Sequence, residues 1–393
     1  MFNVVFKNNA FQLLNLEKLT LAEQEYLKTY LSQASRYKVI GSHQKAPVFS
    51  LYQAPLSSPP GIRSLAMRLK RRFEQVRIPA NATIAVNRAC QCECEHCSAV
   101  FYNHSLKKDL NTLELKQALK ESVELGVTNV ILLGGEPLLR KDLFEQIQSI
   151  DKTKSVVTLF TNGEYLSEEN CTKLAESGLM GVFVSLDSLD EKIHDSLRKR
   201  SGLFKKALQG IENLQTEGIL TALSSYLSPT RLQEGVLEGM MEFGKKLGVN
   251  EVTFFDAIPS GRWIHSTEQL LQEADRKIIA EKVNHYRKNP DYPGISAQST
   301  LTSEKGSAFC FAANTQFYLT AHGEMCPCDF TPLTIGKFPK ENIKTLWEKM
   351  IRTPPYNCRA KSCRMQDASF RKKYIDPLDT GKSFPQKLIP STI

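Results

Sequence analysis

Three cysteines of this chain have a spacing that can hold an iron–sulfur cluster on a single loop. Cys90, Cys94 and Cys97 are separated by three and by two residues. Cysteine thiolates are the usual ligands of [4Fe–4S] clusters. Three thiolates bind three irons, and the fourth iron then keeps the open position that a catalytic metal needs for its substrate. The spacing therefore predicts a redox cluster that can bind a small molecule.

A fourth cysteine in the same loop, Cys92, leaves two other interpretations open. All four thiolates could close one cluster, or Cys94 and Cys97 could form half of a zinc site. A zinc knuckle usually forms a small separate module, whereas this loop directly follows a short apolar strand, residues 83–87. The position at a strand end favours the catalytic cluster.

A regular alternation of apolar strands and amphipathic helices positions the loop. The predicted strands cover residues 83–87, 129–135, 155–163, 180–188, 219–225 and 252–257. Such alternation favours an α/β fold with a parallel sheet and outer helices, here a partial (β/α)6 TIM-like barrel. Chemistry in these barrels lies at the C-terminal ends of the strands. The cysteine loop and the GGEP, TNG and SLDS segments all fall there.

The strand–helix alternation covers only the middle of the chain. We predict an N-terminal extension over residues 1–80, the barrel over 81–290, a small auxiliary domain over 291–375 and a C-terminal tail over 376–393. Five further cysteines lie in the auxiliary region, namely Cys310, Cys326, Cys328, Cys358 and Cys363. Clustered cysteines in a reducing compartment more often bind metal than form disulfides.

The order of the motifs resembles the radical S-adenosylmethionine (SAM) superfamily. The loop from Cys90 to Cys97 resembles the cluster signature of that family, and Gly134-Gly135-Glu136-Pro137 is similar to its GGEP motif. The resemblance extends over residues 83–260 and implies that the cluster reduces SAM to a 5′-deoxyadenosyl radical, which abstracts a hydrogen from the substrate. The electron would come from a donor such as flavodoxin or ferredoxin.

The resemblance also implies which residues contact SAM. His96 would lie near the adenine, and Gly134, Gly135 and Glu136 would bind the amino group. Asn162, Ser185 and Asp187 would contact the ribose and the methionyl part, and Arg198 would approach the carboxylate, which a guanidinium matches well.

The C-terminal cysteines resemble the auxiliary-cluster region of SPASM and twitch enzymes. Gly323 and Cys328 have the Gly-x4-Cys spacing of that region. The resemblance implies one further [4Fe–4S] cluster on Cys310, Cys328, Cys358 and Cys363. Cys326 is then surplus or replaces Cys328, and a structural zinc site or plain buried cysteines are the alternatives.

The charge pattern gives a weaker indication of partners. The net charge is +9, and the densest basic stretch is Arg63, Arg68, Lys70, Arg71 and Arg72 on a predicted helix. We interpret this stretch as a solvated helix face, with docking of an acidic peptide or a nucleic acid as the alternative. We expect no nucleic-acid partner, no membrane span and no secretory signal, and therefore a cytoplasmic protein.

Two substrate classes fit these motifs. The first is a ribosomally made precursor peptide or protein that is crosslinked, epimerised or oxidised, because an N-terminal extension can help to hold a leader. The second is a small molecule, such as a sugar, a cyclitol or a tetrapyrrole, because a single auxiliary cluster is typical of twitch-type enzymes. A non-catalytic iron–sulfur protein is the third possibility, and the SAM-contact motifs argue against it.

Overall fold

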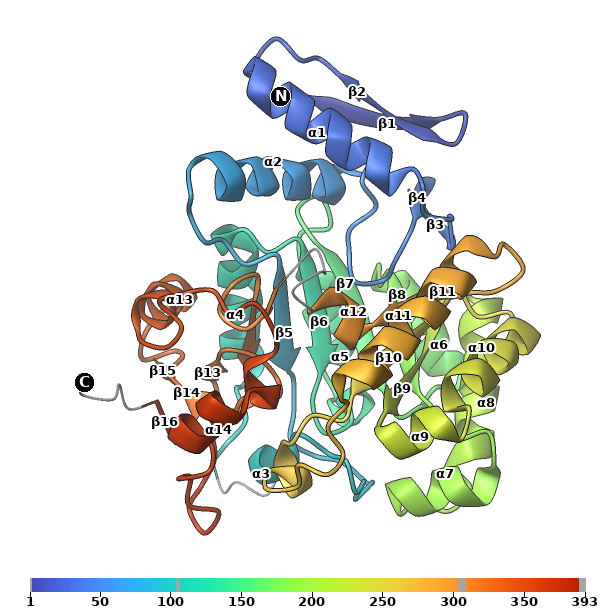
Figure 1. Cartoon of the computed structure of the whole chain (residues 1–393), viewed down its shortest axis with the longest axis vertical. Helices are drawn as coiled ribbons and strands as arrows, with labels where there is room; N and C mark the ends of the chain where they lie inside the picture. Colours follow the sequence, from blue (N-terminus) through green and yellow to red (C-terminus); the bar gives the residue numbers. More distant parts are fainter. Residues whose placement is uncertain (1, 104–106, 303–308, 389–393) are drawn as a thin grey trace.

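The computed structural model describes residues 2–103, 107–302 and 309–388 of the chain. The N-terminal part forms a small module at one end of the central sheet (Figure 1). This module contains β1 (Asn3–Lys7), β2 (Ala10–Leu14), α1 (Leu21–Ala34), β3 (Gly41–His43), β4 (Ala46–Val48) and α2 (Pro59–Phe73). Thr20 and Glu23 form a capping box at the start of α1, and Ser58 caps α2. Leu27 and Leu69 are buried in a core of the module's own.

A central sheet of parallel strands carries the rest of the fold. Its strands are β5 (Asn81–Ala85), β6 (Asn129–Leu133), β7 (Val156–Thr161), β8 (Gly181–Ser185), β9 (Leu220–Leu227), β10 (Glu251–Asp256) and β11 (Gly294–Ala297). Each of them pairs in parallel with the next in chain order. The six predicted strands are confirmed as β5 to β10, and the α/β barrel class is confirmed with them.

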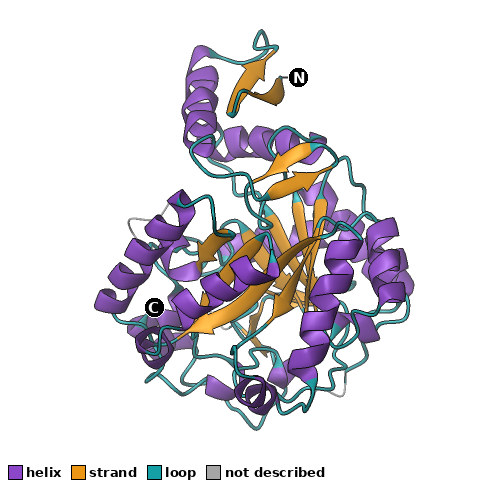
Figure 2. Ribbon diagram, turned by 90° about the vertical axis from the view of Figure 1, so that its right-hand side faces the viewer, coloured by secondary structure: helices purple, strands orange, loops and turns teal. Residues whose placement is uncertain are grey.

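Helices connect these strands and cover the outside of the curved sheet (Figure 2). They are α3 (Val100–Asn103), α4 (Thr112–Leu125), α5 (Leu143–Gln148), α6 (Glu168–Glu176), α7 (Glu191–Arg198), α8 (Leu203–Thr216), α9 (Pro229–Gln233), α10 (Val236–Leu247), α11 (Glu273–Lys288) and α12 (Gln298–Leu301). Within the described ranges, none of the helices is both long and apolar enough to cross a membrane.

The predicted end of the barrel at residue 290 is too early by one strand. Helix α11 and strand β11 continue it, and β11 pairs in parallel with β10. Because β11 has only four residues and begins with the glycine of a Pro-Gly pair, its pattern is too short to be read as a strand.

The C-terminal region extends the same sheet at its opposite edge. It contains β12 (Gln316–Leu319), β13 (Glu324–Cys326), β14 (Leu333–Thr334), β15 (Gly336–Lys337), α13 (Ile343–Arg352), α14 (Ala368–Tyr374) and β16 (Gln386–Lys387). Strand β12 pairs in parallel with β5 and antiparallel with β13, with which it forms a hairpin around Gly323. The predicted auxiliary region and the barrel therefore share one sheet.

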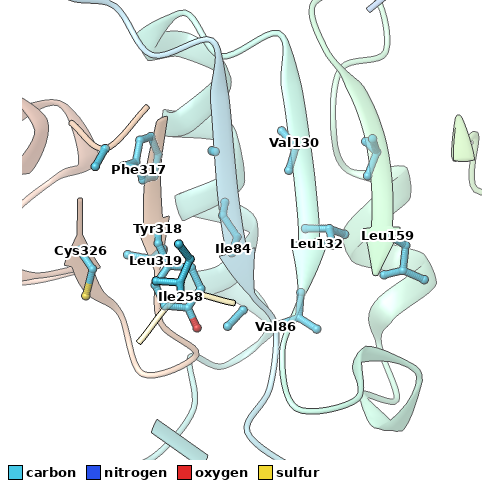
Figure 3. Close-up of a cluster of buried hydrophobic side chains, with 14 of the residues drawn as sticks. Ile84, Val86, Val130, Leu132, Leu159, Ile258, Phe317, Tyr318, Leu319 and Cys326 are labelled. Carbon is cyan, nitrogen blue, oxygen red and sulfur yellow. The ribbon is translucent and has the colours of Figure 1, made fainter. Parts of the chain in front are cut away.

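The junction between these two parts is packed as core. Ile84 of β5 lies between Val130 and Leu132 of β6 and the β12 side chains Phe317 and Leu319, as Figure 3 shows. All five side chains are buried in one continuous hydrophobic cluster. Burial of this kind is the main stabilising contribution to a sheet of parallel strands.

Candidate active site

The cysteine loop follows β5 and is held against the end of helix α7. The backbone N–H groups of Glu93 and Glu95 donate to the last two carbonyls of that helix, at 3.2 and 3.1 Å. Gly261 closes the other side, because its backbone has φ +53° and an added Cβ would lie 1.9 Å from the carbonyl oxygen of Cys97. Only glycine combines that conformation with so close an approach.

The thiols of the loop lie close to a cation. The N–H of Cys92 donates to Cys90 Sγ at 3.4 Å, and Arg198 Nη1 lies 3.9 Å from Cys94 Sγ. A hydrogen bond from Cys92 and the Arg198 charge lower the pKa of Cys94 to about 7, whereas burial raises the pKa of Cys97 to about 12. A cysteine beside a guanidinium is easily converted to the thiolate, which is its metal-binding form.

His96 and Arg198 both lie within ion-pair distance of the buried Asp187 carboxylate. Asp187 Oδ2 lies 2.7 Å from Arg198 Nε and 3.3 Å from His96 Nε2. Burial lowers the pKa of His96 to about 4, so the ring is neutral at pH 7. Although burial opposes it, the Arg198 charge holds the pKa of Asp187 below its usual range. His96 Nδ1 is buried and has no hydrogen-bond partner within the part of the chain that the structure describes.

The two glycines of the GGEP segment allow the cysteine loop to pack on the end of β6. A Cβ on Gly134 would lie 2.5 Å from Asn87 Oδ1, and one on Gly135 would lie 2.2 Å from the carbonyl oxygen of Ala89. The N–H of Gly135 donates to the carbonyl of Asn87 at 3.0 Å. These glycines therefore bring two backbone segments into direct contact.

Glu136 does not lie where the resemblance implies. Its side chain is fully buried, and it is absent from the cavity wall described below. The carboxylate accepts hydrogen bonds from the Leu138 N–H at 3.1 Å, from Thr161 Oγ1 at 2.7 Å and from the Asn162 N–H at 2.9 Å. In this structure these hydrogen bonds let Glu136 connect the ends of β6 and β7.

A cavity of about 1100 Å³ extends from the cysteine loop to the N-terminal module. The other predicted SAM-contact residues and the three predicted cluster ligands line it, namely His96, Gly134, Gly135, Asn162, Ser185, Asp187, Arg198, Cys90, Cys94 and Cys97. They come from the C-terminal ends of β5 to β8 and from α7. The structure therefore brings ten of the eleven residues of these two groups to one wall.

The second group of cysteines opens on the same cavity. Cys310, Cys328 and Cys363 line it, and burial raises the pKa of all three thiols. Cys358 is exposed and outside the cavity wall, with its Sγ 3.3 Å from the Pro355 carbonyl oxygen. The structure therefore does not bring the fourth predicted ligand to the other three. Cys326 lies on β13 and is fully buried among apolar side chains (Figure 3).

The loop thiols fit a cluster better than a single ion. Within the described residues, no three side chains of the His, Cys, Asp or Glu type are arranged to hold one metal ion. A zinc ion requires its ligands to converge on one point. The thiolates of a [4Fe–4S] cluster bind different irons and need only face the same space. Cys90, Cys94 and Cys97 do so, since all three line the cavity.

Two aromatic residues of the site were not predicted from the sequence. The ring of His96 lies 4.7 Å from that of Tyr226 and 6.0 Å from that of Trp263. Arg231 lies over Tyr226 at 4.1 Å and donates to the backbone carbonyl of Asp187. Tyr226 lies at the end of β9, where the barrel rule would have directed attention to it.

Comparisons with known proteins identify relatives of this chain. Residues 84–230 match the sequence model of the radical SAM superfamily. An AdoMet-dependent heme synthase of Methanosarcina barkeri is 27% identical over 66% of this chain and 79% of its own. A GTP 3',8-cyclase of Nautilia profundicola is 26% identical over 67% of this chain and 83% of its own.

Solved structures show a similar fold. Streptococcus suis SuiB bound to precursor peptide SuiA aligns over 85% of this chain and 77% of its own, with a TM-score of 0.57 and 15% identity. anSMEcpe with bound AdoMet and a peptide aligns over 74% of this chain and 84% of its own, with a TM-score of 0.56 and 18% identity. The radical SAM superfamily uses a [4Fe–4S] cluster and SAM as cofactors. Residues 84–230, with the cysteine loop near their start, form a radical SAM domain.

Proposed function

We propose that this chain reductively cleaves SAM with a cluster held by Cys90, Cys94 and Cys97, and that it acts on a substrate bound in the same cavity. The observation that carries the proposal is the shared wall, where these three thiols lie with His96 and Arg198. When bound, the cluster supplies the electron that converts SAM to a 5′-deoxyadenosyl radical, which then abstracts a substrate hydrogen.

The residues around the thiols have distinct tasks in this proposal. Arg198 is fixed through Nε by Asp187, and its remaining N–H groups are available for the carboxylate of SAM. His96 offers the unpartnered Nδ1 and an aromatic face to the adenine. Gly134 and Gly135 line the same cavity, and their backbone carbonyls would accept from the amino group.

The three cavity-lining cysteines of the C-terminal region are proposed ligands of an auxiliary cluster. Cys310, Cys328 and Cys363 face the same space as the SAM site. A cluster there would lie beside the substrate and would accept the electron that a substrate radical loses on oxidation. Support for this placement comes from β12, which joins the auxiliary region to the barrel sheet.

Two substrate classes remain, and each has its own support. A precursor peptide is supported by an N-terminal module that contributes α1 and α2 side chains to the cavity wall. A tetrapyrrole is supported by relatives named heme synthase and Fe-coproporphyrin III synthase. The cavity, at about 1100 Å³, lies at the upper end of ligand-site volumes and suits a large substrate of either class.

Anaerobic incubation with SAM and dithionite tests the cleavage of SAM, which is common to both substrate classes. We expect 5′-deoxyadenosine from the iron-loaded chain and none from the Cys90→Ala/Cys94→Ala/Cys97→Ala variant. Iron content should fall from about eight to about four atoms per chain in that variant, because each cluster holds four. A fully iron-loaded chain that forms no 5′-deoxyadenosine would refute the proposal.

A further inference from the structure

The basic stretch of helix α2 is solvated only in part, at Lys70 and Arg72. Arg63 is half-buried, and its Nη1 donates to the carbonyl oxygens of Val127 and Lys154 at 2.6 and 3.0 Å. Arg68, Arg71 and Arg72 line the large cavity. Arg359, from the loop after α13, lines it as well. We call Arg68, Arg71, Arg72 and Arg359 the arginine rim.

The arginine rim lies at the far end of the cavity from the cysteine loop. Helix α2 covers one end of the sheet, and α3 and α7 lie at the other (Figure 1). Arg72 and Arg359 are exposed, whereas Arg68 and Arg71 are half-buried. We interpret this difference in exposure as an entrance to the cavity, with two guanidinium groups at the protein surface and two deeper inside.

The charge of the arginine rim is not balanced by acidic groups. Arg68 lies 4.1 Å from the centre of the Tyr30 ring, and Arg71 donates to the carbonyl oxygen of Ile78 at 2.9 Å. Among the described residues, no carboxylate forms an ion pair with any of these four arginines. Burial and the neighbouring Arg68 and Arg359 charges lower the pKa of Arg71 to about 10. Like charges held together in this way are costly unless an anion joins them.

We infer that the arginine rim binds carboxylate groups of the substrate while the rest of the substrate reaches toward the cysteine loop. Guanidinium groups bind carboxylates through paired, charge-assisted hydrogen bonds. The aromatic side chains Tyr26, Tyr30 and Phe49 line the same end and offer apolar contact next to the charges. A substrate with clustered carboxylates on a large apolar body fits this combination. The inference rests on the proposed function, since it names the class of substrate for that cavity.

Clustered carboxylates could come from an acidic peptide or from a carboxylated macrocycle, so the experiment uses a probe for each. Binding of coproporphyrin III is followed by fluorescence, and binding of an acetylated hexaglutamate peptide by calorimetry, with hexaglutamine as its neutral counterpart. The test variant is Arg72→Gln/Arg359→Gln, because both side chains are exposed and their loss does not disturb the fold. The matched control is Lys246→Gln/Lys288→Gln, which removes the same charge from exposed positions on α10 and α11 outside the cavity.

We expect at least one probe to bind saturably to the iron-loaded wild type and about tenfold or more weakly to the test variant, because two charge-assisted contacts are lost. The control should bind like the wild type, and the probe that binds identifies the source of the carboxylates. The inference is overturned if neither probe binds saturably, if the neutral peptide binds as tightly as the acidic one, or if both double variants behave alike. Formation of 5′-deoxyadenosine by the wild type is measured in the same preparation, so failure of the proposed function is distinguished from failure of this inference.

Discussion

The Glu136 carboxylate accepts a 2.9 Å hydrogen bond from the backbone N–H of Asn162, so a fully buried side chain ties the end of β6 to the end of β7. The segment held in this way carries Asn162 to the cavity wall. Glu136 thus influences the proposed SAM site through its neighbour and without facing the cavity itself.

Replacing Glu136 by Gln should destabilise the fold and loosen this wall. The amide nitrogen would face donors in a buried site, which costs about 1–3 kcal/mol. We expect a lower midpoint of thermal unfolding and weaker SAM binding under anaerobic conditions. A Glu136→Gln variant with both quantities unchanged would contradict the positioning role.

Replacing Arg198 by Lys should weaken SAM binding while preserving the charge. Lysine cannot place one donor on Asp187 at 2.7 Å and still direct others into the cavity as the planar guanidinium does. We expect the dissociation constant for SAM to rise about tenfold, which corresponds to one charge-assisted hydrogen bond. Lys246→Gln on α10 serves as a control, and equal SAM affinity in both variants would rule out the proposed role of Arg198.

Stability should depend on pH through His96. Because its folded pKa of about 4 is below the unfolded value of 6.5, its contribution is present above pH 6.5 and is lost as the pH falls toward 4. Between pH 7 and pH 5 this loss amounts to about 2 kcal/mol. The free energy of unfolding of His96→Phe, measured by urea at both pH values, should show a correspondingly smaller difference. His285→Gln, at an exposed position on α11, should retain the wild-type difference.

Replacing Gly261 by Ala should displace the cysteine loop. The added Cβ would overlap the Cys97 carbonyl oxygen, which is backbone and cannot rotate away. Gly202 is the matched control, since its φ of +74° is similarly left-handed but its Cβ would meet nothing within 4 Å. We expect Gly202→Ala to cost about 1 kcal/mol of conformational strain and to keep its iron. Gly261→Ala should lose the iron of the SAM cluster, and equal iron content in the two variants would count against the close approach.

The cysteines of the C-terminal region should differ in their effect on iron content. Cys363→Ser should lose the iron of the auxiliary cluster, about four atoms, because Cys363 faces the cavity with Cys310 and Cys328. Cys358→Ser should keep it, because that thiol is exposed and outside the cavity wall. Loss of iron in Cys358→Ser would show instead that the loop closes on the cluster and would restore the four-ligand prediction.

The sequence was sufficient for the strands whose side chains are uniformly apolar and for the motifs at their ends. Strands β5 to β10 follow from that pattern, and the gathering of Cys90, His96 and Arg198 was implied by the resemblance to the radical SAM superfamily. The sequence was not sufficient where tertiary contacts decide whether a segment forms a strand or where a side chain lies. Strand β11 is too short to show a period, and the burial of Glu136 depends on donors from Thr161 and Asn162 that lie on another strand.

Helix α2 is a second case in which the sequence alone did not show where the side chains lie. A run of arginines looks alike whether it faces water or a cavity, because periodicity reports only which face is apolar. Arg68 and Arg71 line the cavity because α1 and the loop after α13 complete its wall around α2. That information is contained in the packing of three distant segments and in no single window of the sequence.

The parallel pairing of β12 with β5 also has a consequence for the order in which the protein can be built. During synthesis, the strand that precedes the cysteine loop emerges early, but its second neighbour is translated only when most of the chain has left the ribosome. Until then β5 has one open edge, and such edges readily pair with other chains. Insertion of the cluster before β12 arrives would therefore occur beside a strand that has only one of its two neighbours.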